Sequence, residues 1–79
     1  MVYPNPSALV ANVKFNNPII EDITLELYNN LGSLIFEKKV PKGTRETSIP
    51  VEDYPDGVYI IRIINQDELF GISKLTISK

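Results

Sequence analysis

Alternation of apolar and polar residues is the feature that most constrains the fold of this chain. In the segment ITLELYN, Ile23, Leu25 and Leu27 alternate with residues of a more polar kind. Successive side chains of a strand point to opposite faces, so this period predicts a strand with one buried face. No stretch of useful length shows the helical period of about 3.6 residues. The sequence therefore predicts an all-β fold.

Further strands are predicted where short apolar segments lie between turn signals. The turns are NLG, PKGT, EDYPDG and NQDE, and Gly32 in the first of them can take a positive φ. Six or seven short strands separated in this way predict a small antiparallel Ig-like β-sandwich. Besides ITLELYN, the predicted strands cover residues 8–15, 33–40, 45–51, 57–65 and 69–79.

Individual residues refine this arrangement. Residues 57–65 carry apolar groups on both faces, which favours a central strand. Within them, Arg62 is expected to extend its charged head to the rim. Tyr59 is expected to pack in the core with its hydroxyl at the core margin. Pro50 cannot donate a ladder hydrogen bond, so residues 45–51 are predicted to lie at an edge or to end there.

The first and last predicted strands are less regular. Residues 69–79 contain two apolar groups of different parity, and a β-bulge at Gly71 would bring both groups to the core face. These groups are Leu69, Phe70 and Ile72, followed by Leu75 and Ile77. In residues 8–15, the side chains expected to point inward are Leu9 or Val10 and then Val13 and Phe15.

The composition offers little for catalysis. The 79 residues include no cysteine, histidine or tryptophan, which excludes disulfides, thiolate nucleophiles, imidazole bases and the usual zinc sites. The serines therefore have no base to activate them, and the four glycines form no phosphate-binding loop. The net charge is −2 with scattered basic residues, so neither nucleic acid nor a polybasic membrane anchor is indicated. We expect a binding or structural module without a cofactor.

Two other readings of the residues remain. Glu52, Asp53 and Asp56 could supply oxygen ligands to Ca²⁺, but Tyr-Pro and Asp-Gly are ordinary turn chemistry, so a plain turn is favoured. A carbohydrate-binding or adhesion module of a surface enzyme is the alternative function. It would need several exposed coplanar aromatic rings, and Tyr28 is the obvious exposed one.

The order of four segments is more informative than any one of them. They are YPNP at residues 3–6, LYNNLGSLI at 27–35, YPDGVYIIRI at 54–63 and KLTISK at 74–79. Together they resemble the type IX secretion C-terminal sorting domain of the Bacteroidetes. The resemblance covers residues 2–79, with Tyr54 and Pro55 standing where the family often has a leucine-proline pair. It implies that residues 1–79 form a single domain, the last one of a longer exported protein.

The resemblance implies that the domain is a non-enzymatic secretion signal. Such cargo crosses the inner membrane by a separate N-terminal signal and passes through the periplasm. The terminal sandwich is then recognised by an outer-membrane translocon and its shuttle protein. A sortase-like protease commonly removes the domain, and the cargo is left at the cell surface or secreted. No nucleic acid and no direct membrane insertion are expected.

Two segments are the predicted recognition sites. The first is rigid because proline holds φ near −65°, and it consists of Tyr3, Pro4, Asn5 and Pro6. The second could offer an edge to a partner strand, or could be an ordinary last strand whose lysines guard that edge. It consists of Lys74, Leu75, Thr76, Ile77, Ser78 and Lys79. Structural roles in turns and core are expected for Gly32, Gly57, Tyr59 and Gly71.

Overall fold

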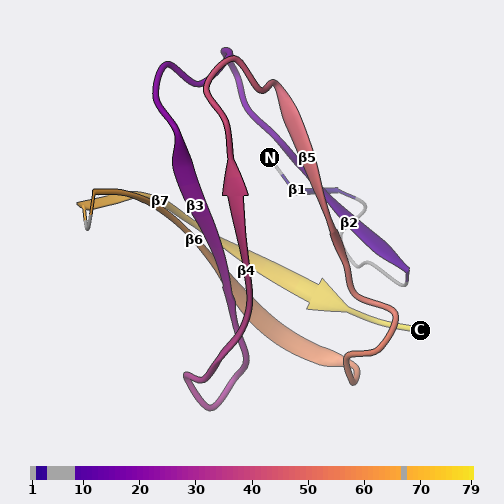
Figure 1. Cartoon of the computed structure of the whole chain (residues 1–79). Helices are drawn as coiled ribbons and strands as arrows, with labels where there is room; N and C mark the ends of the chain where they lie inside the picture. Colours follow the sequence, from indigo (N-terminus) through magenta and orange to yellow (C-terminus); the bar gives the residue numbers. More distant parts are fainter. Residues whose placement is uncertain (1, 4–8, 67) are drawn as a thin grey trace.

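Two antiparallel sheets build the molecule, which is seen here in a computed structural model that describes residues 2–3, 9–66 and 68–79 (Figure 1). These residues contain seven strands and no helix. One sheet has the order β1-β2-β5, with β1 Val2–Tyr3, β2 Val10–Lys14 and β5 Glu46–Pro50. The other has the order β4-β3-β6-β7, with β3 Ile23–Tyr28, β4 Leu34–Val40, β6 Gly57–Asn65 and β7 Glu68–Ile77. The all-β sandwich prediction is confirmed.

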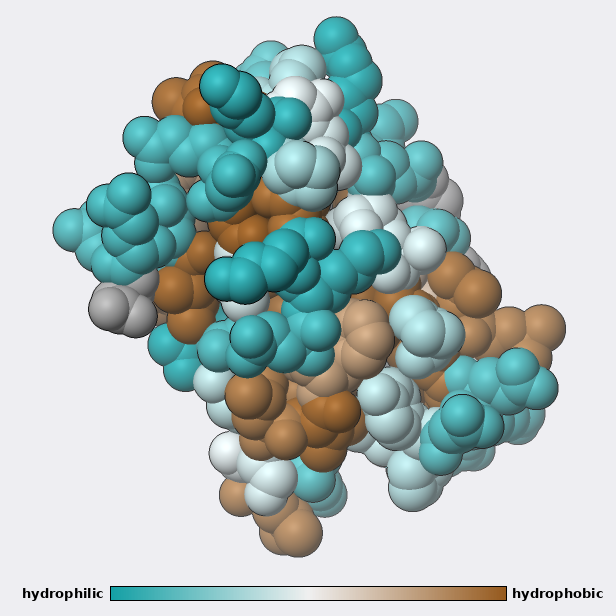
Figure 2. Space-filling view, viewed as in Figure 1, coloured by the Kyte–Doolittle hydropathy of each residue, from teal (hydrophilic) through white to brown (hydrophobic). Residues whose placement is uncertain are grey.

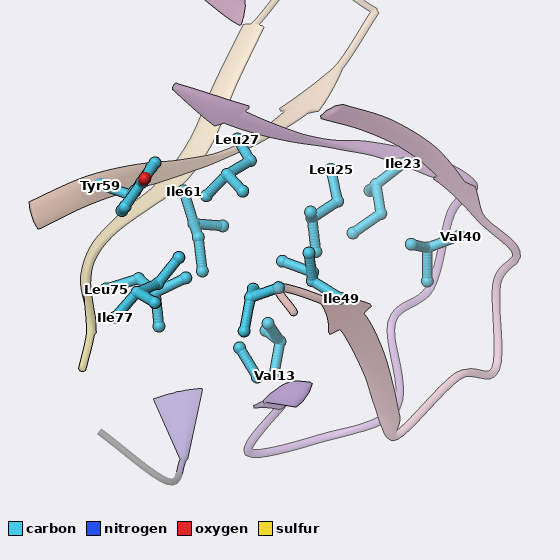
Figure 3. Close-up of a cluster of buried hydrophobic side chains, with 12 residues drawn as sticks. Val13, Ile23, Leu25, Leu27, Val40, Ile49, Tyr59, Ile61, Leu75 and Ile77 are labelled. Atoms are coloured by element: carbon cyan, nitrogen blue, oxygen red, sulfur yellow. The ribbon is translucent and has the colours of Figure 1, made fainter. Parts of the chain in front are cut away.

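The core lies between the two sheets. Alternate residues of β3 are buried, as the period of two requires. Figure 3 shows the side chains of Ile23 and Leu25 directed toward Val13 and Ile49 of the smaller sheet. β6 and β7 add further side chains to the same cluster, and the predicted packing of Tyr59 is confirmed. The buried apolar residues are Ala11, Val13, Ile23, Leu25, Leu27, Val40, Ile49, Val51, Tyr59, Ile61, Leu75 and Ile77.

The strand positions follow from composition. β6 lies between β3 and β7, so the prediction of a central strand is confirmed. β5 lies at an edge of the smaller sheet and ends at Pro50, which agrees with the missing donor of that residue. In the β3–β4 turn, Gly32 has a φ of 82°, which a side-chain-bearing residue adopts only at a cost.

The bulge expected in the last strand is present, but its consequence differs from the prediction. Ile63 pairs with Gly71 while Ile64 pairs with Leu69, so Phe70 is the extra residue. Leu69, Phe70 and Ile72 are nevertheless 55%, 62% and 62% exposed. The expectation that they face the core is wrong. Ile72 pairs with Arg62 and Leu69 pairs with Ile64, on the outer face of the sheet. The bulge at Phe70 comes before Ile72 in the strand, so it does not turn Ile72 toward the core.

The first strand also corrects the sequence reading. Leu9 and Val10 are both exposed, and the buried residue before Val13 is Ala11. Leu9 has the right parity but precedes the strand, where its carbonyl accepts a hydrogen bond from the Val51 amide. Val10 lies on the opposite face of β2 from Val13. The expected inward Val13 is confirmed, and Phe15 is partly buried against the core.

Candidate functional site at one end of the sandwich

The two predicted recognition segments are described to different extents. Tyr3 lies in β1, where its backbone pairs with Asn12, whereas Pro4, Asn5 and Pro6 lie outside the described residues. The role expected for this N-terminal segment therefore stays a prediction.

The second segment forms the end of β7, an edge strand of the four-stranded sheet. Leu75 and Ile77 are 0% and 1% exposed, while Lys74 and Ser78 are exposed and Thr76 is half-buried. One face of the strand therefore belongs to the core and the other faces outward. A partner can reach this segment at its edge and its outer face, but not through its buried apolar side chains.

Lys79, the residue that ends the same segment, is folded onto the turn between β5 and β6. Its backbone amide donates to Asp56 Oδ1 at 3.2 Å, and its Nζ donates to the carbonyl oxygens of Glu52 and Tyr54. The Asp56 carboxylate and two backbone carbonyls of this turn are thus acceptors for the chain itself. The part of the chain that the structure describes holds no group of three or more carboxylate, imidazole or thiol ligands arranged for a metal ion.

Tyr59 holds the same turn from inside. Its side chain is 5% exposed, and its hydroxyl donates to the Pro55 carbonyl at 2.5 Å. A tyrosine at the start of a strand whose hydroxyl returns to the backbone a few residues upstream is the tyrosine corner of Ig-like sandwiches. Sequence reasoning missed this role. The signal was present, because Tyr59 follows the Asp56-Gly57 turn by two residues.

The β3–β4 turn lies at the same end of the molecule. The Asn29 side chain accepts hydrogen bonds at Oδ1 from the amides of Leu31 and Ser33, at 2.9 and 3.0 Å. An asparagine that binds its own backbone two residues ahead stabilises a turn. Leu31 and Leu34 of this hairpin are exposed. The β3–β4 turn lies at the lower end of Figure 1, and Figure 2, in the same view, shows hydrophobic surface at that end.

A pocket lies between these two turns, and we call it the end pocket. Its volume is about 210 Å³. Tyr54 and Tyr59 both line it, and the centroids of their rings lie 6.3 Å apart with the ring planes at 35°. Its lining consists of Asn29, Asn30, Ile35, Tyr54, Pro55, Asp56, Gly57, Val58 and Tyr59.

The end pocket joins segments that are distant in the sequence. LYNNLGSLI supplies the asparagines and Ile35, and YPDGVYIIRI supplies the residues from Tyr54 to Tyr59. KLTISK contributes Lys79, which binds the neighbouring turn. Three of the four segments singled out in the sequence thus meet at one end of the sandwich. Gly71 does not belong to this end, because it lies at the bulge, where its nearest side-chain neighbour is Ile63.

A second hollow lies at the opposite end of β3 and β6, with a volume of about 520 Å³. Its acidic residues already accept hydrogen bonds from the chain. Asp22 Oδ1 accepts the Lys42 amide at 2.8 Å, and the Asn65 side-chain amide donates to Glu21. One carboxylate oxygen of Glu21 and one of Asp22 are therefore occupied by groups of the chain itself.

Tyr28 lies on the outer face of the large sheet, away from the end pocket. Its hydroxyl donates to Glu26 Oε1 at 2.9 Å, and the Arg62 guanidinium lies 5.3 Å from the ring centroid. Arg62 therefore does not extend to the rim, as the sequence suggested, but covers this ring. The hydrogen bond to Glu26 raises the pKa of Tyr28 above 10.0, and burial and the Glu26 charge add to the rise, while Arg62 opposes it.

Comparison with known families decides what this fold is used for. The family of the secretion system C-terminal sorting domain has a model that matches residues 1–78. The chain belongs to this family. A search of the curated proteins found no match. The sorting domain is thus a C-terminal signal for type IX secretion, as the order of the four segments predicted.

Membership of the sorting-domain family also indicates the kind of protein that carries the domain. The family is a family of sorting signals and not of enzymes, and its members are carried by secreted or cell-surface proteins. A sorting domain acts on a cargo attached at its N-terminal side and interacts with the type IX machinery. Among the residues that the structure describes, no helix is long and apolar enough to span a membrane.

Proposed function

We propose that the sorting domain is a non-enzymatic address that the type IX machinery reads in its folded form. The observation that carries this proposal is the dual character of β7. Leu75 and Ile77 are buried in the core, yet the strand that bears them is the edge of its sheet. An edge strand offers backbone groups to an additional strand, and this edge exists only once the sheet has formed.

The partners would be the outer-membrane translocon and its shuttle protein. We place their contact along β7 and the segment from Lys74 to Lys79. Lys74 is exposed on the outer face of the sheet, where its neighbour across the ladder is Ile60. A partner strand at this edge would lie beside Lys74, and its side chains would reach the apolar outer face near Ile72.

A sorting signal of this kind implies a route of export for the cargo protein. The domain, residues 1–79, would be the last unit of an exported protein whose own N-terminal signal directs it across the inner membrane. It would fold in the periplasm and then be carried through the translocon. A sortase-like protease would cut the linker before the domain, and the cargo would remain on the surface or be released. The proline-containing segment from Tyr3 to Pro6 would direct the chain from that linker into the sandwich.

The experiment compares two charge reversals on one face of the sheet. A periplasm-targeted fluorescent protein is fused to residues 1–79 in a type IX-competent bacterium, and fluorescence at the surface and in the medium is measured. Lys74→Glu changes the β7 edge. Lys39→Glu makes the same charge change on β4, at the opposite edge, and Lys39 is also exposed. Circular dichroism of the purified domains checks that both variants fold.

We expect the parent fusion and the Lys39→Glu fusion to be exported, and the Lys74→Glu fusion to be retained in the periplasm. Equal export of both variants would show that the β7 edge is not the surface that is read. Retention of the parent fusion, with its domain folded, would overturn the sorting function itself.

A further inference from the structure

The end pocket is too small for a typical cofactor but suits one side chain. Pockets for small molecules occupy about 300–1,000 Å³. The end pocket encloses about 210 Å³ and lies between two turns that are each held by their own hydrogen bonds. The end pocket is therefore preformed, and a bound side chain would not have to order the two turns.

The walls of the pocket attract positive charge. Tyr54 is half-buried and Tyr59 is almost fully buried, and both residues line the cavity. The face of an aromatic ring carries partial negative charge and binds a guanidinium or ammonium group placed over it. The same domain already contains such a pair on its outer face, where Arg62 covers Tyr28.

The charge at the entrance of the end pocket is also negative. Asp56 lines the pocket, and Glu52 and Asp53 belong to the same turn. Asp56 Oδ1 accepts the Lys79 amide, which leaves Oδ2 for a second donor. The turn carries three carboxylates, and the ammonium group of Lys79 that binds its backbone supplies one positive charge, which leaves an excess of negative charge at this end.

The same turn already contacts one cationic group of the chain. The Lys79 ammonium donates to the carbonyl oxygens of Glu52 and Tyr54, on the part of the turn next to the pocket. Backbone oxygens of this turn are therefore directed toward a positively charged group. The pocket adds two aromatic rings and a carboxylate that Lys79 leaves partly unused.

We propose that the end pocket binds an arginine side chain of a partner polypeptide. The guanidinium of this arginine lies against the ring of Tyr54 and donates hydrogen bonds to the Asp56 carboxylate. The apolar part of the arginine side chain contacts Val58. Arginine fits better than lysine, because its planar group stacks on a ring and pairs with a carboxylate at the same time. The inference rests on the proposed function for the source of the arginine, which would be a component of the secretion machinery.

The test is a nuclear magnetic resonance titration of the purified domain with the capped peptide Gly-Gly-Arg-Gly-Gly. We expect saturable shifts at Asn30, Tyr54 and Gly57. The same peptide with citrulline in place of arginine keeps the shape and loses the charge, so it should bind at least about tenfold more weakly. The lysine peptide should bind with intermediate affinity. Equal binding of the arginine and citrulline peptides would overturn the proposal.

Two pairs of variants locate the binding. Asp56→Asn should weaken it at least about fivefold, whereas Asp53→Asn makes the same charge change in the same turn outside the pocket lining and should alter it less than about twofold. Tyr54→Leu should weaken it more than Tyr28→Leu, which removes a ring on the outer sheet face. Equal effects of the two aspartate variants would mean diffuse attraction to the acidic turn and would overturn the assignment to the pocket.

Arginine binding by the end pocket and export of the cargo can be lost independently of each other. The titration uses the isolated 79-residue domain and no secretion machinery. A domain that exports its cargo but does not distinguish arginine from citrulline keeps the sorting function and loses the arginine site. A domain that binds arginine in the pocket but exports nothing loses the sorting function alone.

Discussion

Tyr59 shows how one hydroxyl group can tie a turn to a strand. We predict that Tyr59→Phe lowers the free energy of unfolding by about 0.5–1.5 kcal/mol, because it removes the bond to the Pro55 carbonyl and little else. Tyr54→Phe is the matched control. Its hydroxyl lies 3.4 Å from the Ile35 carbonyl, too far for a strong bond, so the loss should be smaller. Urea denaturation measures both, and equal losses would contradict the tyrosine corner.

Tyr28 gives a prediction about pH. Its pKa is raised above 10.0 mainly by the hydrogen bond to Glu26, so folding favours the protonated hydroxyl. The stability that this group contributes is complete below pH 10.0 and is lost as the pH rises through the higher pKa of the folded state. We expect Glu26→Gln to lower the Tyr28 pKa and to flatten the alkaline loss. Ring signals of Tyr28 followed against pH report the first effect, and an unchanged or higher pKa in the variant would contradict it.

At the scale of the element, strand alternation was a reliable guide where the opposing sheet covers the strand. It placed Ile23, Leu25 and Leu27 correctly. The first half of β7 was misplaced because its inward orientation depended on a bulge at Gly71. The bulge lies at Phe70 instead, so Ile72 keeps the outward parity of Lys74. Ala11 was missed for another reason: its small side chain does not stand out in hydropathy, although counting back from Val13 would have found it.

The two halves of β7 therefore differ in what they contribute. Leu75 is fully buried, and we predict that Leu75→Ala lowers the free energy of unfolding by about 2–5 kcal/mol through lost burial and a residual cavity. Ile72 lies three residues earlier and is 62% exposed, so Ile72→Ala should stay within about 0.5 kcal/mol. Chemical denaturation of both variants checks this. Comparable losses would mean that the hairpin is covered in solution by something that the isolated chain does not show.

At the scale of the whole molecule, the meeting of distant segments could not be read from the sequence. The order of the four segments indicated the family, but nothing in that order says that Asn29, Asn30 and Ile35 line one pocket with residues 54–59. Their proximity follows from the sheet order, since β3 and β6 are neighbours and run antiparallel. The end of β3 and the start of β6 therefore lie together, and each carries its turn to the same end of the sandwich.

The size of the domain connects stability to sorting. A core of this size supplies only about 3–5 kcal/mol of net stability in a chain of 70–80 residues. Removing residues 74–79 would delete Leu75 and Ile77, and the sandwich would then unfold. Loss of export after such a truncation would not separate a recognised sequence from a required fold. A single core substitution makes that distinction, because it leaves every exposed residue of the segment in place.

The most direct test of the account compares export with folding in one fusion. Residues 1–79, carrying either no change, Leu75→Ala or Ile20→Ala, are joined to a periplasm-targeted fluorescent protein in a type IX-competent bacterium. Ile20 is 82% exposed and lies far from β7 in the sequence, so it serves as the control. Surface fluorescence is measured beside protease resistance of the domain. We expect export of the parent and of Ile20→Ala, and periplasmic retention of Leu75→Ala in step with its loss of protease resistance. Export of Leu75→Ala at the parent level, despite lost protease resistance, would contradict recognition of the folded domain.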